Sequence, residues 1–178
     1  MSQNSEAAMT SSPFSTGAIE LASAGGHSLR LLPLEPHSVR PLAEALAAME
    51  PWSVMNISAD RLAAFLTNPD GALCRYVVSL DGADAGVVSI RFPWLKGPYL
   101  ELLALLPQAQ DRGIGRTIMA WLEVTARRHE ARNLWVCASS SNAKALRFYE
   151  RHGFEAVGTL PDLVAEGYDE ILLRKFPL

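Results

Sequence analysis

Gln110-Asp111-Arg112-Gly113-Ile114-Gly115 is the stretch of sequence from which the fold can be worked out. It follows an apolar run, Tyr99 to Leu106, which predicts a strand that Pro107 closes. Apolar residues then recur at the helical period, which predicts a helix from about Ile114 to Glu130. A glycine-containing turn that opens a helix leaves backbone N–H groups unpaired at the positive end of the helix dipole. The stretch therefore predicts a binding site for a phosphate or pyrophosphate group.

Two other glycine motifs do not fit this stretch. A Walker-type loop requires Gly-x-x-x-x-Gly-Lys-Ser/Thr, and both the lysine and the spacing are missing. A dinucleotide fingerprint requires a third glycine, but Ile118 stands three residues beyond Gly115. By itself the pattern also fits an ordinary strand-to-helix turn, so a second motif is needed to decide.

That second motif lies further along the chain, in Ser141-Asn142-Ala143-Lys144-Ala145-Leu146-Arg147-Phe148-Tyr149-Glu150-Arg151-His152-Gly153-Phe154. Together the two segments resemble the GNAT superfamily of acetyl-CoA-dependent N-acetyltransferases. Gln110 to Gly115 matches that family's Gln/Arg-x-x-Gly-x-Gly/Ala loop. Asn142 to Phe154 matches its Asn-x-x-Ala-x-x-Phe-Tyr-x-x-x-Gly-Phe motif. The resemblance covers residues 28 to 176, almost the whole chain.

The resemblance implies an α/β (α+β) chain with the GNAT fold. That fold is a mixed, mostly antiparallel sheet of about seven strands flanked by about four helices, and its parallel fourth and fifth strands splay apart. The patterns along the chain give the same order of elements. We predict strands at Ser28 to Leu34, Arg75 to Leu80, Ala85 to Phe92, Tyr99 to Leu106, Leu134 to Ser139, Phe154 to Thr159 and Glu170 to Lys175, and helices at Val39 to Met49, Ala59 to Leu66, Ile114 to Glu130 and Ala143 to His152.

The resemblance also implies where acetyl-CoA binds. The pantetheine arm would pair with backbone groups of Leu103 and Leu105 as an additional strand. The pyrophosphate would lie on N–H groups of the loop, with arginine charges nearby, although those arginines equally fit a solvated helix end. Asn142 fits a helix N-cap that can also bind the pantetheine amide. The implied cofactor-binding residues are Leu103, Leu105, Gln110, Arg112, Gly113, Ile114, Gly115, Arg116, Asn142 and Tyr149.

Acetyl transfer to an amine needs a base for the amine and a proton for the departing thiolate. Tyr149 matches the position of the family's acid, and the alternative is an ordinary core aromatic residue. Glu101 is the candidate base, because a carboxylate inside an apolar strand is unfavourable unless it is used or paired. Strand alternation would place Glu101 on one face with Tyr99, Leu103 and Leu105. The alternative is that Glu101 pairs with an arginine.

The resemblance implies that the acceptor is a primary amine, of a small molecule or of a peptide. The fifth strand resembles that of the ribosomal-protein alanine acetyltransferases, but Cys137 replaces their glutamate, which argues against peptide N-terminal acetylation. Glu50-Pro51-Trp52 and Pro93-Trp94 are predicted in loops that border the acceptor side, or serve as local packing anchors. We keep three functions open: a small-molecule N-acetyltransferase, a peptide N-terminal or lysine acetyltransferase, and a non-catalytic acyl-CoA-binding regulatory module.

Composition bounds the remaining possibilities. The chain has 178 residues, of which 49% are hydrophobic and 20% charged, and a net charge of −3, which gives no reason to expect a nucleic-acid partner. Cys74 and Cys137 fit buried free thiols, and four scattered histidines give no metal signature. Without an apolar run of membrane-spanning length or a signal peptide, we expect a cytoplasmic protein. Residues 1–18 are expected to form a disordered tail and residues 19–178 a single GNAT domain; a homodimer is allowed for.

Overall fold

The computed structural model describes residues 12–14, 17–21 and 26–178, so most of the segment expected to form a disordered tail lies outside the described residues. Within that segment, Phe14 is 3% exposed and packs edge-on against Phe92 and Trp121. The strands are β1 (Ile19–Glu20), β2 (Leu29–Pro33), β3 (Leu73–Leu80), β4 (Ala83–Trp94), β5 (Gly97–Leu105), β6 (Leu134–Ser139), β7 (Glu155–Ala165) and β8 (Tyr168–Lys175). The helices are α1 (Pro36–Ala47), α2 (Ala59–Thr67), the short 3-10 helix η2 (Pro107–Ala109), α3 (Ile114–Arg128) and α4 (Ala143–Arg151).

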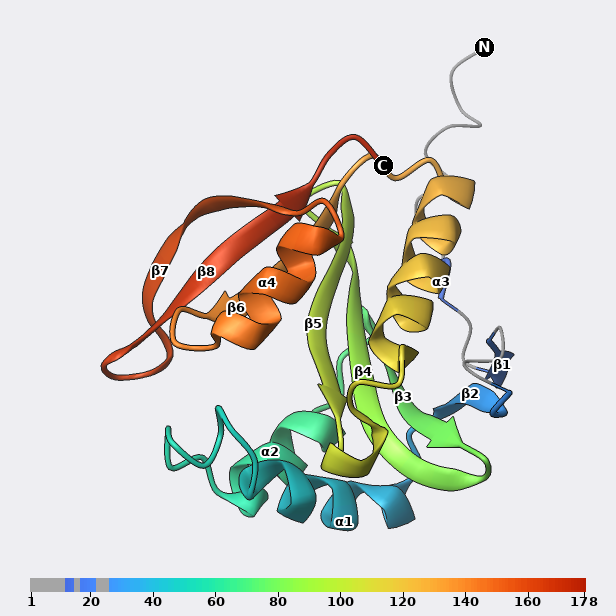
Figure 1. The fold of residues 1–178 in the computed structure, drawn as a ribbon, viewed down its shortest axis with the longest axis vertical. Helices are drawn as coiled ribbons and strands as arrows, with labels where there is room; N and C mark the ends of the chain where they lie inside the picture. The colour runs from blue at the N-terminus through green and yellow to red at the C-terminus, as the bar shows by residue number, and fades with distance from the viewer. Residues whose placement is uncertain (1–11, 15–16, 22–25) are drawn as a thin grey trace.

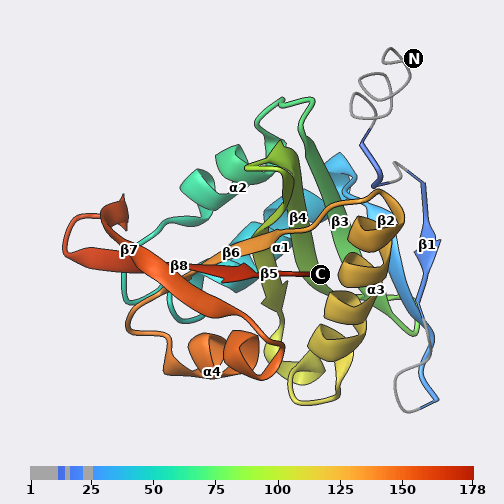
Figure 2. The same ribbon diagram turned by 90° about the horizontal axis from the view of Figure 1, so that it is seen from above.

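The strands form one mixed sheet with helices on both faces (Figure 1). The strand order is β1-β2-β3-β4-β5-β6-β8-β7, and β5 and β6 are the one parallel pair among the described strands. Helices α3 and α4 lie over one face and α1 and α2 over the other, as the view from above shows (Figure 2). The predicted fold class and GNAT architecture are therefore confirmed.

Strands β5 and β6 pair only at one end, which produces the predicted splay. Two residue pairs connect them, Tyr99 with Trp135 and Leu100 with Val136. At this closed end, a Cβ on Gly97 would lie 2.1 Å from the carbonyl oxygen of Asn133, so only glycine allows the two strands to approach so closely. Beyond it the strands diverge (Figure 1), and each keeps its other neighbour, β4 or β8.

The structure adds to the predicted elements at both ends of the chain. Strand β1 pairs with β2 beyond the expected first strand, giving eight strands where the sequence analysis expected about seven. Strands β7 and β8 extend as a hairpin from Glu155 to Lys175, past the predicted gap between Thr159 and Glu170. The predicted β3–β4 turn is confirmed: Asp81 and Gly82 both have positive φ, at 52° and 85°, as a two-residue hairpin requires.

A β-bulge in β5 overturns one expectation drawn from strand alternation. Ser89 and Ile90 of β4 pair with Leu102 and Leu100, so Glu101 is the extra residue. Leu103 packs in the core beneath α3, whereas Leu102 packs in the core beneath α1 and α2. Glu101 hydrogen-bonds Ser89, which pairs with Leu102. Glu101 therefore lies on the face of Leu102 and not on that of Leu103 and Leu105.

Candidate active site

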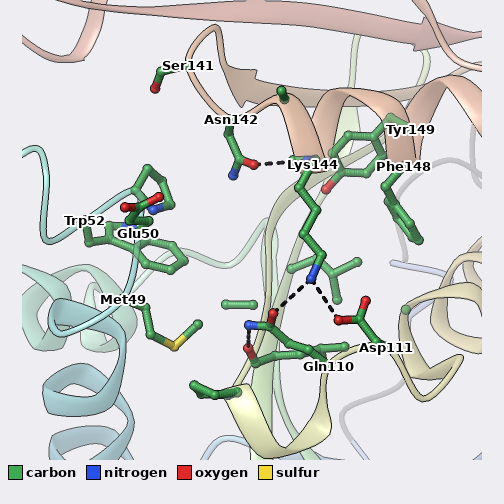
Figure 3. A pocket seen from close by; sticks show the side chains of 18 of the residues that line it. Met49, Glu50, Trp52, Gln110, Asp111, Ser141, Asn142, Lys144, Phe148 and Tyr149 are labelled. Atoms are coloured by element: carbon green, nitrogen blue, oxygen red, sulfur yellow. Dashed lines mark hydrogen bonds and ion pairs between the residues drawn. The ribbon is translucent and has the colours of Figure 1, made fainter.

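A cavity of about 1540 Å³ occupies the splay and extends to the segment between α1 and α2 (Figure 3). It is larger than a typical pocket for one small ligand, which suits two substrates bound end to end. The residues that line it come from the α1–α2 segment, the end of β5, the start of α3, the start and one face of α4, and β8. Of the sequence-predicted site residues, the cavity brings together Leu103, Leu105, Gln110, Gly113, Ile114, Gly115, Arg116, Asn142 and Tyr149.

The start of α3 has the geometry of an anion site. Gly113 is the N-cap, with φ of 78°, a conformation that side chains other than glycine rarely adopt. The first hydrogen bond of the helix runs from the N–H of Thr117 to the carbonyl of Gly113. The preceding N–H groups, of Ile114, Gly115 and Arg116, therefore have no intrahelical acceptor, and all three residues line the cavity.

Gly115 also allows α3 to approach α4. A Cβ at this position would lie 3.3 Å from the Cζ atom of Phe148, tighter than an ordinary van der Waals contact. Phe148 lines the cavity as well. The second glycine of the loop thus serves helix packing beside the anion site, a role that the sequence motif alone does not reveal.

The two arginines of the loop are placed differently. Arg116 lines the cavity, whereas Arg112 does not. The Arg112 guanidinium donates to Nε2 of His27 over 2.6 Å, and Nδ1 of His27 lies 2.6 Å from a carboxylate oxygen of Asp81. Of the two, Arg116 is therefore the arginine whose charge is in place for a bound phosphate.

Lys144 connects the two motifs across the cavity. Its ammonium group, on α4, donates to the side-chain oxygen of Gln110 over 3.2 Å and to Asp111 over 3.1 Å (Figure 3). The amide nitrogen of Gln110 in turn donates to the carbonyl oxygen of Leu105 over 3.0 Å. The sequence analysis did not single out Lys144, although it stands two residues after Asn142 within the quoted motif.

Asn142 caps α4, as expected. Its side-chain oxygen accepts a hydrogen bond of 3.0 Å from the N–H of Ala145, and Asn142 also lines the cavity. The cap satisfies one of the first N–H groups of the helix and fixes where α4 begins. About two turns further along, this start brings Tyr149 to the cavity wall.

Tyr149 is buried with only 6% of its surface exposed, between Phe148 and Phe154 at ring-centroid distances of 5.3 and 5.6 Å. Its hydroxyl points into the cavity (Figure 3). Burial raises the pKa of the phenol, and nearby Cys137 and Glu170 raise it further. The hydroxyl therefore stays protonated at neutral pH, as a proton donor must.

Glu101, the predicted base, does not line the cavity. Its carboxylate accepts a hydrogen bond of 3.0 Å from the Ser89 hydroxyl and pairs with Arg91 at 3.2 Å. Arg91 also pairs with Asp70 at 2.8 Å. This is the arginine pairing that the sequence analysis kept as the alternative, and the role of Glu101 as a base stays a prediction.

The far end of the cavity is formed by the α1–α2 segment and β8. Glu50, Pro51 and Trp52 line it, whereas Trp94 packs outside it, stacked on Tyr99 at 4.7 Å. Tyr168 of β8 also lines this end, and its hydroxyl donates to the carbonyl oxygen of Val54 over 2.9 Å. Of the two tryptophans expected to border the acceptor side, Trp52 lines the cavity and Trp94 does not.

Glu170 is a buried carboxylate that the sequence analysis did not predict as a site residue. It is 7% exposed, and burial raises its pKa to about 7. It lies directly opposite Ser139 in the pairing of β6 with β8. A single glutamate in an otherwise ordinary last strand gives no sequence signal, because its burial depends on the strands on either side of it, β6 and β7.

Metal-ligating clusters are absent from the part of the chain that the structure describes, where no group of three His, Cys, Asp or Glu residues could hold an ion. Among the described helices, none is long and apolar enough to cross a membrane.

Comparison with known proteins identifies the family. The family model described as "Acetyltransferase (GNAT) family" matches residues 39–154, which include both sequence motifs. The chain belongs to the GNAT acetyltransferase family.

Relatives with named activities match over part of their length. An uncharacterised N-acetyltransferase of Mycobacterium tuberculosis is 30% identical over 113 residues, which cover 58% of this chain and 65% of that protein. Streptothricin acetyltransferase of Streptomyces lavendulae is 32% identical over 82 residues, 46% of this chain and 43% of that enzyme. The chain thus spans about two thirds or less of the curated relatives it matches.

Solved structures show the same architecture. Nourseothricin acetyltransferase is 25% identical, with a TM-score of 0.55 over 62% of this chain and 69% of that one. A GNAT-family protein of Desulfovibrio desulfuricans is 23% identical, with a TM-score of 0.63 over 84% of this chain and 98% of that one. A Vibrio cholerae spermidine N-acetyltransferase chimera is 24% identical, with a TM-score of 0.63 over 83% and 95%.

Proposed function

We propose that this chain is an N-acetyltransferase that transfers the acetyl group of acetyl-CoA to a primary amine of a small molecule. The observation that carries the proposal is one continuous cavity, with the anion site of α3 at one end, Tyr149 in its wall and the α1–α2 segment at the other end. Family membership supports acetyl transfer as the reaction. The two ends of the cavity support separate binding of a phosphate-bearing donor and of an acceptor.

The donor end fits acetyl-CoA on three grounds. The N–H groups of Ile114, Gly115 and Arg116 are available for a pyrophosphate. The cations Arg116 and Lys144 line the same end. The edge of β5 at Leu103 and Leu105 does not pair with β6 and can accept an extended pantetheine arm, although the Leu105 carbonyl already accepts from the Gln110 side chain. When bound, acetyl-CoA supplies an acetyl thioester; the remaining chemistry falls to this chain.

The acceptor end has fewer charged side chains than the donor end and is more apolar. Trp52, Met49 and Met55 line it together with the carboxylate of Glu50. An ammonium group is attracted by both a carboxylate and an aromatic face. Two related proteins carry streptothricin and nourseothricin in their names, and a structural neighbour carries spermidine. These names support a cationic small-molecule amine as the acceptor class.

The proposed reaction is direct attack of the neutral amine on the thioester carbonyl. The amine must first lose a proton, because a primary amine with a pKa of about 10 is mostly protonated at neutral pH. Tyr149 then supplies a proton to the departing sulfur from a hydroxyl that the fold keeps protonated. Backbone N–H groups at the splayed edge of β5 are in a position to polarise the carbonyl.

The experiment that tests this function is thiol release from acetyl-CoA across a panel of acceptors. The panel contains spermidine, a streptothricin-class antibiotic, amino acids and short peptides with free N-termini or lysine side chains. We expect release above background with at least one small amine and less with the peptides. A preference for peptides would instead make the chain a peptide or protein acetyltransferase. Acetyl-CoA binding without release for any acceptor would leave the non-catalytic acyl-CoA-binding alternative.

A further inference from the structure

Glu170 is the one charged side chain among the buried polar residues of the described chain. Burying a carboxylate is unfavourable unless it is paired or used. Among the described residues, no hydrogen bond or ion pair reaches this carboxylate, and burial alone accounts for its altered pKa. Glu101 forms the contrast, since Ser89 and Arg91 satisfy its carboxylate. The fold therefore keeps Glu170 buried without an internal partner.

The sheet places Glu170 between two parts of the cavity wall. Its register partner on β6 is Ser139, whose hydroxyl lies 3.0 Å from that of Ser141, a residue of the wall. Two residues earlier on β8, Tyr168 also lines the wall, and residues two apart on a strand face the same side. Glu170 and Ser139 are not themselves lining residues, but Tyr168 on β8 and Ser141, two residues beyond Ser139, both line the cavity next to them.

Four ionisable side chains surround Glu170. Its charge acts on Tyr99 of β5, Cys137 of β6 and Tyr149 of α4, raising the pKa of all three. Tyr168 is the fourth, on its own strand, and the register partner on β7 is the apolar Leu160. The charge of Glu101 also raises the pKa of Tyr99. None of the four is a lysine, arginine or histidine, and among the described residues no ion pair offsets the charge of Glu170.

We propose, on the basis of the function proposed above, that Glu170 is the carboxylate that binds the ammonium group of the acceptor and takes its proton before the amine attacks. The ammonium would supply the positive partner that the protein itself does not provide. Tyr149, within electrostatic reach of Glu170, marks the side of the cavity where the thiolate departs. Base and acid then lie at one place, at the open end of the splay.

The proton balance is complete with these two residues. The ammonium gives one proton to Glu170, which later passes it to solvent. The amine nitrogen forms its bond to the carbonyl carbon while the carbon–sulfur bond breaks and its electron pair stays on sulfur. Tyr149 gives its proton to the sulfur and regains one from the nitrogen as the amide forms. The products are an N-acetylated amine, free CoA and one released proton.

The test compares wild type with Glu170→Gln, which keeps the size of the side chain but cannot take the proton. With the best acceptor of the panel, we expect kcat/KM for the amine to fall on the order of 10²-fold, with KM for acetyl-CoA within about twofold of wild type. The wild-type rate should rise with pH through an apparent pKa of about 7, and this limb should vanish in the variant. Glu170→Asp should recover part of the rate and the limb.

The matched control is Glu155→Gln, which removes an exposed carboxylate of β7 and should behave as wild type. A Glu170→Gln protein that acetylates the amine as fast as wild type overturns the proposal. So does a Glu170→Gln protein that keeps the rise of rate with pH, if Glu101→Gln loses that rise. Wild-type protein that binds acetyl-CoA but acetylates no amine overturns the proposed function and this inference together. A thermal melt of each variant shows that the compared proteins are folded.

Discussion

At the scale of single residues, the site depends on two buried groups whose ionisation the fold controls. Burial raises the pKa of both the Tyr149 phenol and the Glu170 carboxyl. For the phenol this secures the protonated form that an acid needs. For the carboxyl it brings the pKa to about 7, where a base can exchange protons at neutral pH. One physical effect, desolvation, thus favours both proposed roles.

Replacing Tyr149 with phenylalanine tests the acid. The ring keeps its packing against Phe148 and Phe154, so we expect the fold and acetyl-CoA binding to be preserved. Without the hydroxyl, kcat should fall on the order of 10²-fold in steady-state assays. Tyr76→Phe is the control, since it removes a buried hydroxyl outside the cavity and should leave kcat within about twofold. An unchanged kcat for Tyr149→Phe would show that another group protonates the sulfur.

The buried Glu170 carboxyl also predicts how stability depends on pH. Its pKa is raised from 4.5 in the unfolded chain to about 7 in the fold, so the unfolded state releases this proton first as pH rises. Compared with Glu170→Gln, the free energy of unfolding of wild type should fall as the pH rises from 4.5 to about 7. Above about pH 7 the difference between the two proteins should be constant. Thermal melts at about pH 5 and about pH 8 measure this. If the melting temperature of Glu170→Gln at the higher pH is no higher than that of wild type, this would contradict the burial of a charged Glu170.

At the scale of elements, the cavity follows from how β5 and β6 are joined. The closed end is tight, because Gly97 lies against the backbone of Asn133. The Asn133 side chain donates to the carbonyl of Lys96 over 3.2 Å, and its oxygen accepts from Arg174 over 2.6 Å. The indole N–H of Trp135 donates to the carbonyl of Leu95 over 3.2 Å. The open end lacks such links between β5 and β6 in the described structure, and the cavity forms there.

Gly97→Ala should therefore disturb the closed end. The new Cβ would lie 2.1 Å from the Asn133 carbonyl oxygen, so the strands must separate. Overpacking of this kind costs about 1–3 kcal/mol, which corresponds to a fall in melting temperature of several degrees for a chain of this size. Gly71→Ala is the control, because nothing lies within 4 Å of its Cβ. Equal melting temperatures for the two variants would contradict the tight closed end.

Elements fixed by local sequence were predicted correctly, and those that depend on distant partners were not. The cap at Asn142 and the turn at Asp81 rest on neighbouring residues, and both are present as predicted. The bulge at Glu101 requires a particular register with β4, which alternation within one strand cannot reveal. The burial of Glu170 depends on β6 and β7 on either side of β8, and the contact of Lys144 with Asp111 joins two separate motifs.

At the scale of the whole molecule, the cavity has two ends of opposite character. The donor end has helix N–H groups and the cations Arg116 and Lys144, and the acceptor end has the carboxylate of Glu50. Under the proposed function, such an arrangement would separate a polyanionic donor from a cationic acceptor before they meet at Tyr149. The expected cytoplasmic location, the homodimer and the division at residue 19 remain predictions about the whole protein.

The most direct test of the central claim is the mass of the acceptor after incubation of wild-type protein with acetyl-CoA and the pooled small amines of the panel. The account predicts at least one amine that gains an acetyl group, only when both protein and acetyl-CoA are present. Free CoA should appear in equal amount. Release of CoA without any acetylated amine, or amines that stay unmodified while acetyl-CoA binds, would contradict it.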